Sequence, residues 1–223
     1  MATTFKPFGL KPAYHPSGLD RAVAFVGTNS FLGADTFNAP YSLSAGQAFY
    51  QYQPVSVNGS NQLTIAATSA TGGSAGTVYG VFDGVEFTDS QGRRSVAKWI
   101  SKAALDASTQ IIFWIFQDPA LVYEAQVEGS ADTDSIGQQY DFSATSGYTT
   151  ADGTSIGVGG AGFSKTALAA SPVGTGTQGQ VRVVGLGREV AYPAGETNAW
   201  GDDYTIVQVQ IANNAFVAPK TSV

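Results

Sequence analysis

Short stretches of alternating hydrophobic and polar residues, separated by Gly, Pro, Asn and Asp, run along most of the chain. This alternation has the period of a β-strand, in which successive side chains point to opposite faces. No amphipathic helix of ordinary length stands out, and turn residues recur as in all-β proteins. We therefore predict an all-β fold, a β-sandwich or β-barrel core with an extended N-terminal arm and long Gly/Ser/Thr-rich loops.

Two strands are expected early in the chain. Residues 22–26 form a short apolar run, and residues 48–57 (AFYQYQPVSV) form a long aromatic one. In the long run, the odd-numbered side chains share one face and the even-numbered ones the other. Pro54 lies within it and indicates an edge strand or a bulge, because proline cannot donate a hydrogen bond to a neighbouring strand.

Two hairpins and one undecided segment follow. Asn58-Gly59 stands between PVSV and QLTIAA, which is a hairpin pattern. Asp83-Gly84 stands between TVYGVF and VEFT and predicts a second, cleaner hairpin. Residues 97–105 fit either a short helical turn or the approach to a strand, and the pattern does not decide between them.

The most apolar run, residues 111–116 (IIFWIF), predicts a central, fully buried strand. Asp118-Pro119 ends it, and residues 121–127 are expected to return as its partner strand. Residues 129–180 are rich in Gly, Ser, Thr and Ala and predict short strands at best. Two further strands are expected late in the chain, at residues 180–186 (QVRVVGL) and 204–211 (YTIVQVQI).

The composition is low in charge. Of the 223 residues, 43% are hydrophobic and 13% charged, against about 25% charged in an average soluble domain. Ser, Thr, Asn and Gln must therefore supply most of the polar surface. The length suits one large β-domain or two small ones, so we predict an arm at residues 1–21 and a β-rich domain at 22–223, or two β subdomains meeting near 128–150.

The distribution of charge limits the partners. The net charge of −6 argues against nucleic acid, because phosphate binding needs clustered Lys and Arg. Residues 1–21 are weakly basic, with a net charge of +2, whereas the remainder carries −8. A basic arm on an acidic body suggests docking onto an acidic neighbour.

Several classes of site and location are not expected. The chain has no cysteine, which excludes disulfides and thiolate metal sites. No apolar window has the roughly 20 residues that cross a bilayer, and the first residues lack the apolar core of a signal peptide. We therefore expect a soluble protein that is not secreted by the usual route and has no membrane partner.

Candidate catalytic residues are few. The only histidine, His15, lies in the arm, which is a poor place to hold a catalytic base in register. Glu124 and Glu128 share a strand face but are expected about 13 Å apart, too far for a glycosidase pair. Glu189 and Glu196 could still meet in space. We expect no catalytic residue and no enzymatic activity.

Motifs for cofactors and metals also lack their contexts. Residues 72–76 match G-x-S-x-G without a strand before and a helix after. Residues 157–162 and 174–179 match G-x-G-x-x-G without a βαβ unit. Asp132 and Asp134 are spaced as calcium ligands, but the Gly and Glu of an EF-hand are missing. No cofactor and no metal are expected.

The arm has two open interpretations. Its three prolines, at positions 7, 12 and 16, forbid a helix and favour extended backbone. Apolar side chains are interleaved with these prolines, and an exposed apolar arm is unusual unless it packs on something. Either it packs on its own domain as an edge segment, or it lies on a partner.

Three segments carry a resemblance to a family. FGLKPAYHPSG, at residues 8–18, resembles the start of a group of tailed-bacteriophage structural proteins with a Gly-Leu-Arg/Lys-Pro motif. IFWIFQDPALVY with EAQVEG, at residues 112–129, is similar to their strand–Asp-Pro–strand hairpin. VRVVGLGREV and ETNAWGDDYTIVQVQIANN, at residues 181–190 and 196–214, resemble their closing pair of strands. Residues 28–75 have no counterpart in the resemblance.

The resemblance implies a capsid decoration (cement) or head structural protein. Such a protein sits in many copies on the outer surface of the virion shell, as a homotrimer near three-fold positions, after assembly in the host cytoplasm. Its partners would be the major capsid protein and other copies of itself, and it needs no catalytic residue. By motif, the residues expected to bind the capsid are Phe5, Lys6, Phe8, Leu10, Lys11 and Tyr14.

A second function stays open beside this one. The alternative is a carbohydrate- or host-receptor-binding β-module of a phage fibre or tail. Exposed aromatic side chains lining a groove would favour that alternative, and an apolar patch repeated by three-fold symmetry would favour the decoration protein.

Overall fold

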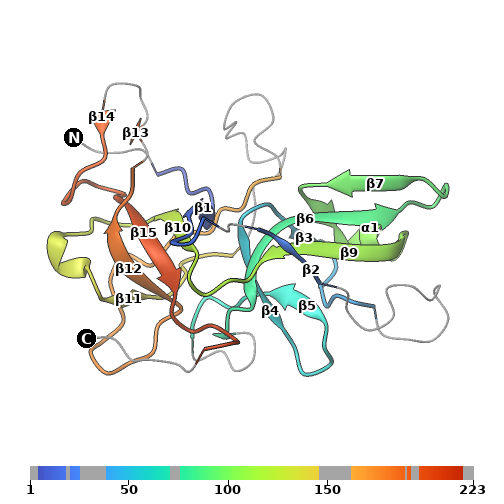
Figure 1. Ribbon diagram of the computed structural model, residues 1–223, viewed down its shortest axis with the longest axis horizontal. Coiled ribbons are helices and arrows are strands. Elements are labelled where there is room, and N and C mark those ends of the chain that lie inside the picture. Colours follow the sequence, from blue (N-terminus) through green and yellow to red (C-terminus); the bar gives the residue numbers. More distant parts are fainter. Residues whose placement is uncertain are drawn as a thin grey trace.

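The fold is all-β, as the alternation predicts. The computed structural model describes residues 5–18, 21–25, 39–70, 76–145, 162–188, 190–191 and 196–217. Antiparallel sheets pack in a sandwich-like arrangement, and the described part contains one short α-helix, α1 (Lys102–Asp106). The two large sheets occupy opposite ends of the long axis (Figure 1).

The first large sheet has five strands. In spatial order they are β1 (Lys11–Tyr14), β10 (Val122–Gln126), β15 (Ile206–Ile211), β12 (Val181–Leu186) and β11 (Gln139–Tyr140). The two strands predicted late in the chain are thus confirmed as β12 and β15, which pair antiparallel. Alternate side chains such as Tyr123, Val183 and Val209 are fully buried in a first core.

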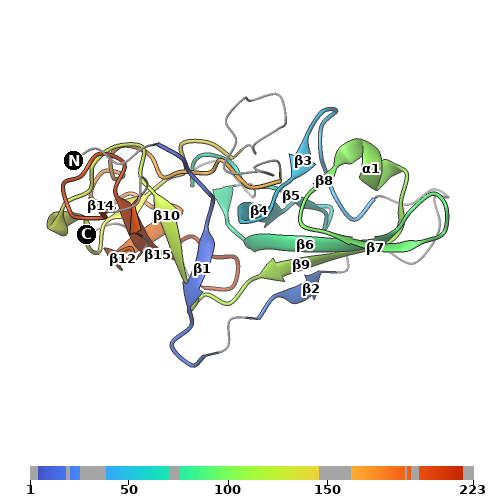
Figure 2. The ribbon, with the colours of Figure 1, turned by 90° about the horizontal axis from the view of Figure 1, so that it is seen from above.

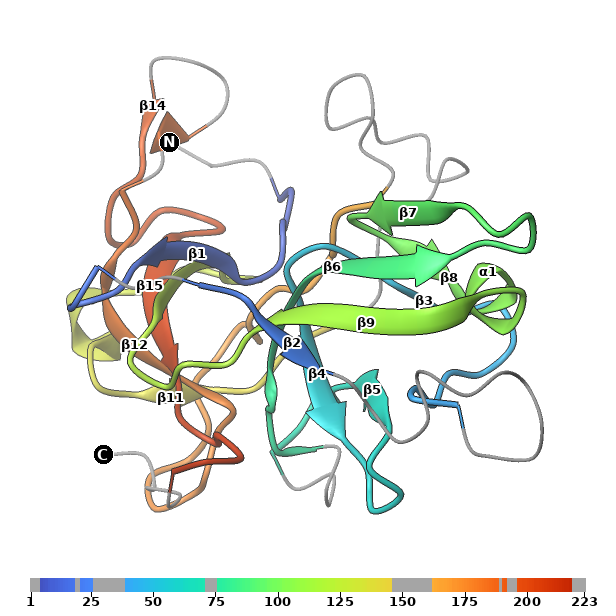
Figure 3. The same ribbon diagram turned by 45° about the vertical axis from the view of Figure 1, so that its right-hand side comes forward.

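The second large sheet has six strands. They are β2 (Val23–Phe25), β9 (Thr109–Phe116), β6 (Gly80–Thr88), β4 (Gln53–Val57) and β5 (Leu63–Ile65), with β7 (Arg94–Ala97) paired to β6. Figure 3 shows β2 beside β9 and β7 beside β6. A second core lies under this sheet, where the ring of Phe49 packs 5.5 Å from that of Phe82 and 5.3 Å from that of Phe113.

Smaller elements complete the described part. They are the pair β3 (Ala48–Phe49) with β8 (Ile100–Ser101), the pair β13 (Val190–Ala191) with β14 (Glu196–Thr197), and the 3-10 turn η2 (Thr133–Ser135). Residues 97–105, left undecided by the sequence, contain both β8 and α1. Between residues 129 and 180, the strand in the described part is the two-residue β11, as expected for this Gly-rich region.

The long strand predicted at residues 48–57 is broken into β3 and β4. The backbone of Tyr52 has φ of +64°, and the Gln53 amide donates to the Tyr50 carbonyl, which makes a turn. Pro54 then lies on β4, between β5 and β6, so the edge-strand interpretation is wrong. The short β5 ladder ends beside it, where the Ala66 amide donates to the Pro54 carbonyl at 3.1 Å.

Of the two predicted hairpins, the first is confirmed and the second is wrong. Asn58-Gly59 lies in the turn between β4 and β5. Asp83-Gly84 lies inside β6, which continues through it with a shift in register against β9. The dipeptide makes a β-bulge there, which is another common use of such residues. The hairpin follows later, where the Asp89 amide donates to the Arg93 carbonyl at 2.9 Å.

Strand β9 is central, but only one of its faces is fully buried. It lies between β2 and β6, and Ile111, Phe113 and Ile115 are buried while the alternate residues are half-buried. Residues 121–127 contain β10, which joins the other sheet and pairs with β1 and β15. The predicted β9–β10 hairpin is therefore wrong, and Asp118-Pro119 belongs to a crossover between the two sheets.

A second connection runs beside this crossover. Residues 11–18 and 21–25, which we call the strap, contain β1 on one sheet and β2 on the other. Strand β1 is antiparallel to β10 and β2 is antiparallel to β9, so strap and crossover span both sheets together (Figure 2). Residues 131, 140 and 142 contribute to the first core.

Candidate interaction surface

The N-terminal arm is packed on its own domain from Gly9 onward. Leu10 has no exposed surface and lies in the first core. The Gly9 amide donates to the Thr166 carbonyl at 3.2 Å, and the Leu10 amide donates to the Tyr52 carbonyl at 2.8 Å. Of the two interpretations of the arm, the structure therefore favours the edge segment over a free arm.

The six residues expected to bind a capsid differ in their exposure. Leu10 is buried, so its side chain cannot reach a partner. Phe8 and Lys11 are half-buried, and Lys11 lies opposite Glu124 on β10. The Lys6 amide donates to the Gln126 side chain at 2.8 Å.

Two aromatic residues of the arm are exposed. Phe5 is 38% exposed, and its ring lies 5.0 Å from that of Tyr204. Tyr14 is 41% exposed, and the Arg188 guanidinium lies 5.9 Å from the centre of its ring. Within the predicted set, these two side chains present the largest apolar surface to a partner.

The only histidine joins the strap to the crossover. His15 Nε2 lies 3.2 Å from Asp118 Oδ2, and the imidazole side chain is 7% exposed. His15 Nδ1 accepts a hydrogen bond from the Ser17 amide at 3.0 Å. Nδ1 is thus an acceptor, and Nε2 approaches the carboxylate without making a hydrogen bond to it. The geometry gives His15 a structural role in the connection between the sheets.

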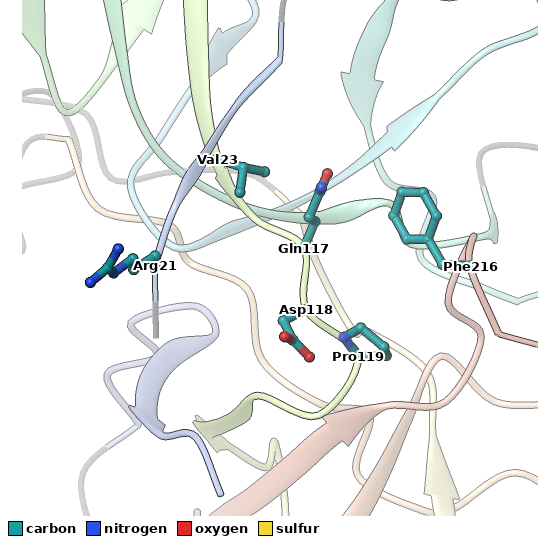
Figure 4. A pocket seen from close by; sticks show the side chains of 6 residues that line it. All are labelled: Arg21, Val23, Gln117, Asp118, Pro119 and Phe216. Carbon is teal, nitrogen blue, oxygen red and sulfur yellow. The ribbon is translucent and has the colours of Figure 1, made fainter. Parts of the chain in front are cut away.

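A groove opens beside this contact. It measures about 460 Å³ and is lined by Arg21, Val23, Gln117, Asp118, Pro119 and Phe216; we call it the strap groove. Arg21 lies at one end and Phe216 at the other, with Asp118 and Pro119 between them (Figure 4). Its lining thus comes from the strap, the crossover and the segment after β15.

The walls of the strap groove combine apolar and charged groups. Val23 is 36% exposed and Phe216 is 56% exposed. The Phe216 ring packs 5.2 Å from that of Tyr79, which in turn packs 5.5 Å from that of Phe25. This aromatic row connects the exposed surface to the second core and holds Phe216 in place.

Two tyrosines near the groove stay protonated at neutral pH. Burial raises the pKa of Tyr123 well above its usual range, and the nearby charge of Asp118 raises it further. Burial also raises the pKa of Tyr79. The Tyr123 hydroxyl donates to the Phe116 carbonyl at 3.3 Å, from β10 to the end of β9. This hydroxyl therefore adds a further link between the sheets.

Three carboxylates, two of them considered from the sequence, have local partners. Glu124 is 6% exposed and accepts a hydrogen bond from the Arg188 amide at 2.8 Å. Asp132 begins η2 in a capping box with Ser135, and Asp202 accepts from the Ala199 amide at 3.0 Å. Across the described residues, no group of three His, Asp or Glu side chains could hold a metal ion.

Some residues of the other motifs considered from the sequence lie outside the described residues. These are positions 72–75, positions 157–161 and Glu189. Residues 174–179 are described and form a turn, in which the Thr177 amide donates to the Gly174 carbonyl at 2.9 Å. In the part of the chain that the structure covers, no helix is both long and apolar enough to cross a membrane.

Sequence reasoning missed Arg21, Val23 and Phe216 as surface residues. Each stands in an ordinary local pattern, so only tertiary packing brings them together in one groove.

Comparisons with protein-family models, curated proteins and solved structures find no match to this chain.

Proposed function

We propose that the protein is a capsid decoration protein that binds the outside of a phage shell through the surface around the strap groove. The observation that carries this proposal is the exposure of Val23 and Phe216 in one groove, with the exposed Tyr14 on the same strap, outside two well-packed cores. The family resemblance of the opening, middle and closing segments supplies the identity of the partner.

The chemistry of this surface suits a protein partner. Aromatic and aliphatic side chains held in a groove are the usual anchors of protein interfaces. Tyr14 and Phe216 are both held by neighbours, Arg188 and Tyr79 respectively. Because their positions are already restricted, binding costs less side-chain entropy.

A decoration function follows from such contacts without any bond-making step. A protein that binds only the assembled shell shifts the assembly equilibrium by mass action. When copies bind as trimers on a repeating lattice, each modest contact is multiplied by the effective concentration of the others. The low charge of the chain, 13%, suits a protein whose interfaces bury much of its surface.

Co-sedimentation with shells assembled without this protein tests the proposal. Wild type should bind at a stoichiometry set by the lattice, and light scattering should give a trimer in solution. Tyr14→Ser and Phe216→Ser should each weaken binding by about tenfold or more, because removal of an interface anchor costs on the order of 2 kcal/mol.

Val96→Ser is the matched control for these variants. Val96 lies on β7 and is 69% exposed, so its loss should change neither folding nor shell binding. Wild-type protein that fails to sediment with any such shell would contradict the proposal. Equal binding by Phe216→Ser would exclude the strap groove as the contact, and equal binding by Tyr14→Ser would exclude Tyr14.

A further inference from the structure

Trp99 and Tyr50 form an aromatic pair next to the two-stranded β3–β8 sheet. Trp99, between β7 and β8, is 47% exposed. Its ring is within 11° of parallel to that of Tyr50, with the ring centres 6.5 Å apart. Neither residue lines the strap groove. Tyr50 is half-buried, so Trp99 is the more exposed ring of the pair.

The backbone of Gly162 holds the Trp99 ring in position. A Cβ atom built at Gly162 would lie 2.7 Å from Trp99 Cδ1, so only glycine allows this approach. The Gly162 carbonyl also accepts a hydrogen bond from the Gln51 amide at 2.9 Å. The tryptophan is therefore fixed against a hydrogen-bonded segment, although nearly half of it is exposed.

The residues next to the aromatic pair in the chain form a polar cluster with Asp83. Lys98 Nζ lies 2.9 Å from both carboxylate oxygens of Asp83. Gln51 Nε2 donates to Asp83 Oδ1 at 3.2 Å. Gln51 follows Tyr50 and Lys98 precedes Trp99 in the chain, so the amide and ammonium groups that contact Asp83 belong to residues adjacent to the two aromatic residues. The opposite charges of Asp83 and Lys98 balance each other.

We infer that the Trp99–Tyr50 pair binds a neutral pyranose sugar. One face of a pyranose ring presents C–H groups, which pack on the electron-rich face of an indole. Its rim presents hydroxyls, which can accept from an ammonium or amide group and donate to a carboxylate. A balanced Asp83–Lys98 pair favours an uncharged ligand over an anion.

Other occupants fit these observations less well. A phosphate-bearing ligand would need a surplus of basic groups, and Lys98 is already paired with Asp83. A protein partner would bury a wider apolar area around the tryptophan, whereas the chain neighbours of the pair include the polar Lys98 and Gln51. On a decoration protein, a sugar site that stays exposed on the assembled shell would let the virion adhere to glycans.

Ligand-observed NMR with a panel of neutral oligosaccharides, made of glucose, mannose, galactose or N-acetylglucosamine, tests the inference. At least one should bind with a dissociation constant near the millimolar range, and the saturation should pass mainly through the C–H protons of one ring face. Trp99→Ala should weaken that binding at least about tenfold. Trp99→Phe should retain part of it.

Val96→Ser again serves as the control, because Val96 is an exposed apolar residue on the adjacent strand without a ring. It should leave sugar binding unchanged. The inference is overturned if no oligosaccharide binds at about 10 mM, or if Trp99→Ala binds as wild type does. Shell co-sedimentation by Trp99→Ala separates the two proposals, because it should remain intact, and its loss would make Trp99 a shell contact.

Discussion

Gly9 fixes the point at which the arm enters the fold. Its φ is +83°, and a Cβ atom there would lie 2.3 Å from the Tyr52 carbonyl oxygen. Both the backbone conformation and the close approach therefore require glycine. The next residue, Leu10, is placed in the first core as a direct consequence.

Replacing this glycine is expected to be costly. Gly9→Ala should lower the free energy of unfolding by about 2–4 kcal/mol, from left-handed backbone strain and overlap with the Tyr52 carbonyl. Urea denaturation monitored by circular dichroism measures the change. Gly59→Ala is the control, since a Cβ there meets nothing within 4 Å and φ is not positive. Equal stability of both variants would contradict this account of Gly9.

At the scale of elements, β1 is a structural strand of the first sheet. It covers the edge of β10, and Leu10 just before it fills the first core. Deleting the arm would therefore remove core packing along with any contact to a partner. A loss of shell binding after such a deletion would not identify the arm as the contact.

Leu10→Ala should cost about 2–5 kcal/mol, as for other buried leucines, and deletion of residues 2–14 should cost more. Hydrogen exchange gives the location of the effect. Amides of β10 should lose protection in the deletion variant, while those at the centre of β9 keep theirs, because β9 is covered by β2. Unchanged protection of β10 would show that the arm is dispensable for the sheet.

At the scale of the whole molecule, strap and crossover join the two large sheets, and Val81 of β6 also packs in the first core. The contact of His15 with Asp118 and the hydrogen bond from Tyr123 to Phe116 both lie at this junction. The junction also lines the strap groove, so its integrity and the proposed shell contact are connected. The junction residues contribute to the stability of both sheets at once.

The tyrosine at this junction predicts an alkaline limit to stability. Tyr123 ionises near pH 10 when unfolded, whereas its folded pKa is raised. Stability from this group is therefore complete below pH 10 and falls as the pH rises toward the folded pKa. Between pH 10 and 11.5, Tyr123→Phe should lose stability less steeply than wild type, by about 1.4 kcal/mol per pH unit.

Urea denaturation over this pH range measures the two slopes. Tyr14→Phe is the matched control, because Tyr14 is 41% exposed, and it should follow the wild-type slope. A Tyr123→Phe variant with the wild-type slope would show that this hydroxyl is not the group responsible.

Much of the fold was accessible from the sequence, because the signals are local. The alternation of β12 and β15, the apolar run of β9 and the Asn58-Gly59 turn each depend on a few neighbouring residues. Of the candidate surface, Tyr14 was named from its place in the arm. The groove residues Val23 and Phe216 carry no local pattern that marks them as exposed.

The sequence by itself determined the all-β class and the positions of most strands, because side-chain periodicity is a property of a short segment. Only the tertiary structure decided which sheet each strand joins: β10 leaves β9 for the other sheet, and Asp83-Gly84 bulges within β6. It also decided that Leu10 is buried and Trp99 exposed. Pairing and burial depend on residues far apart in the chain, so no local pattern contains them.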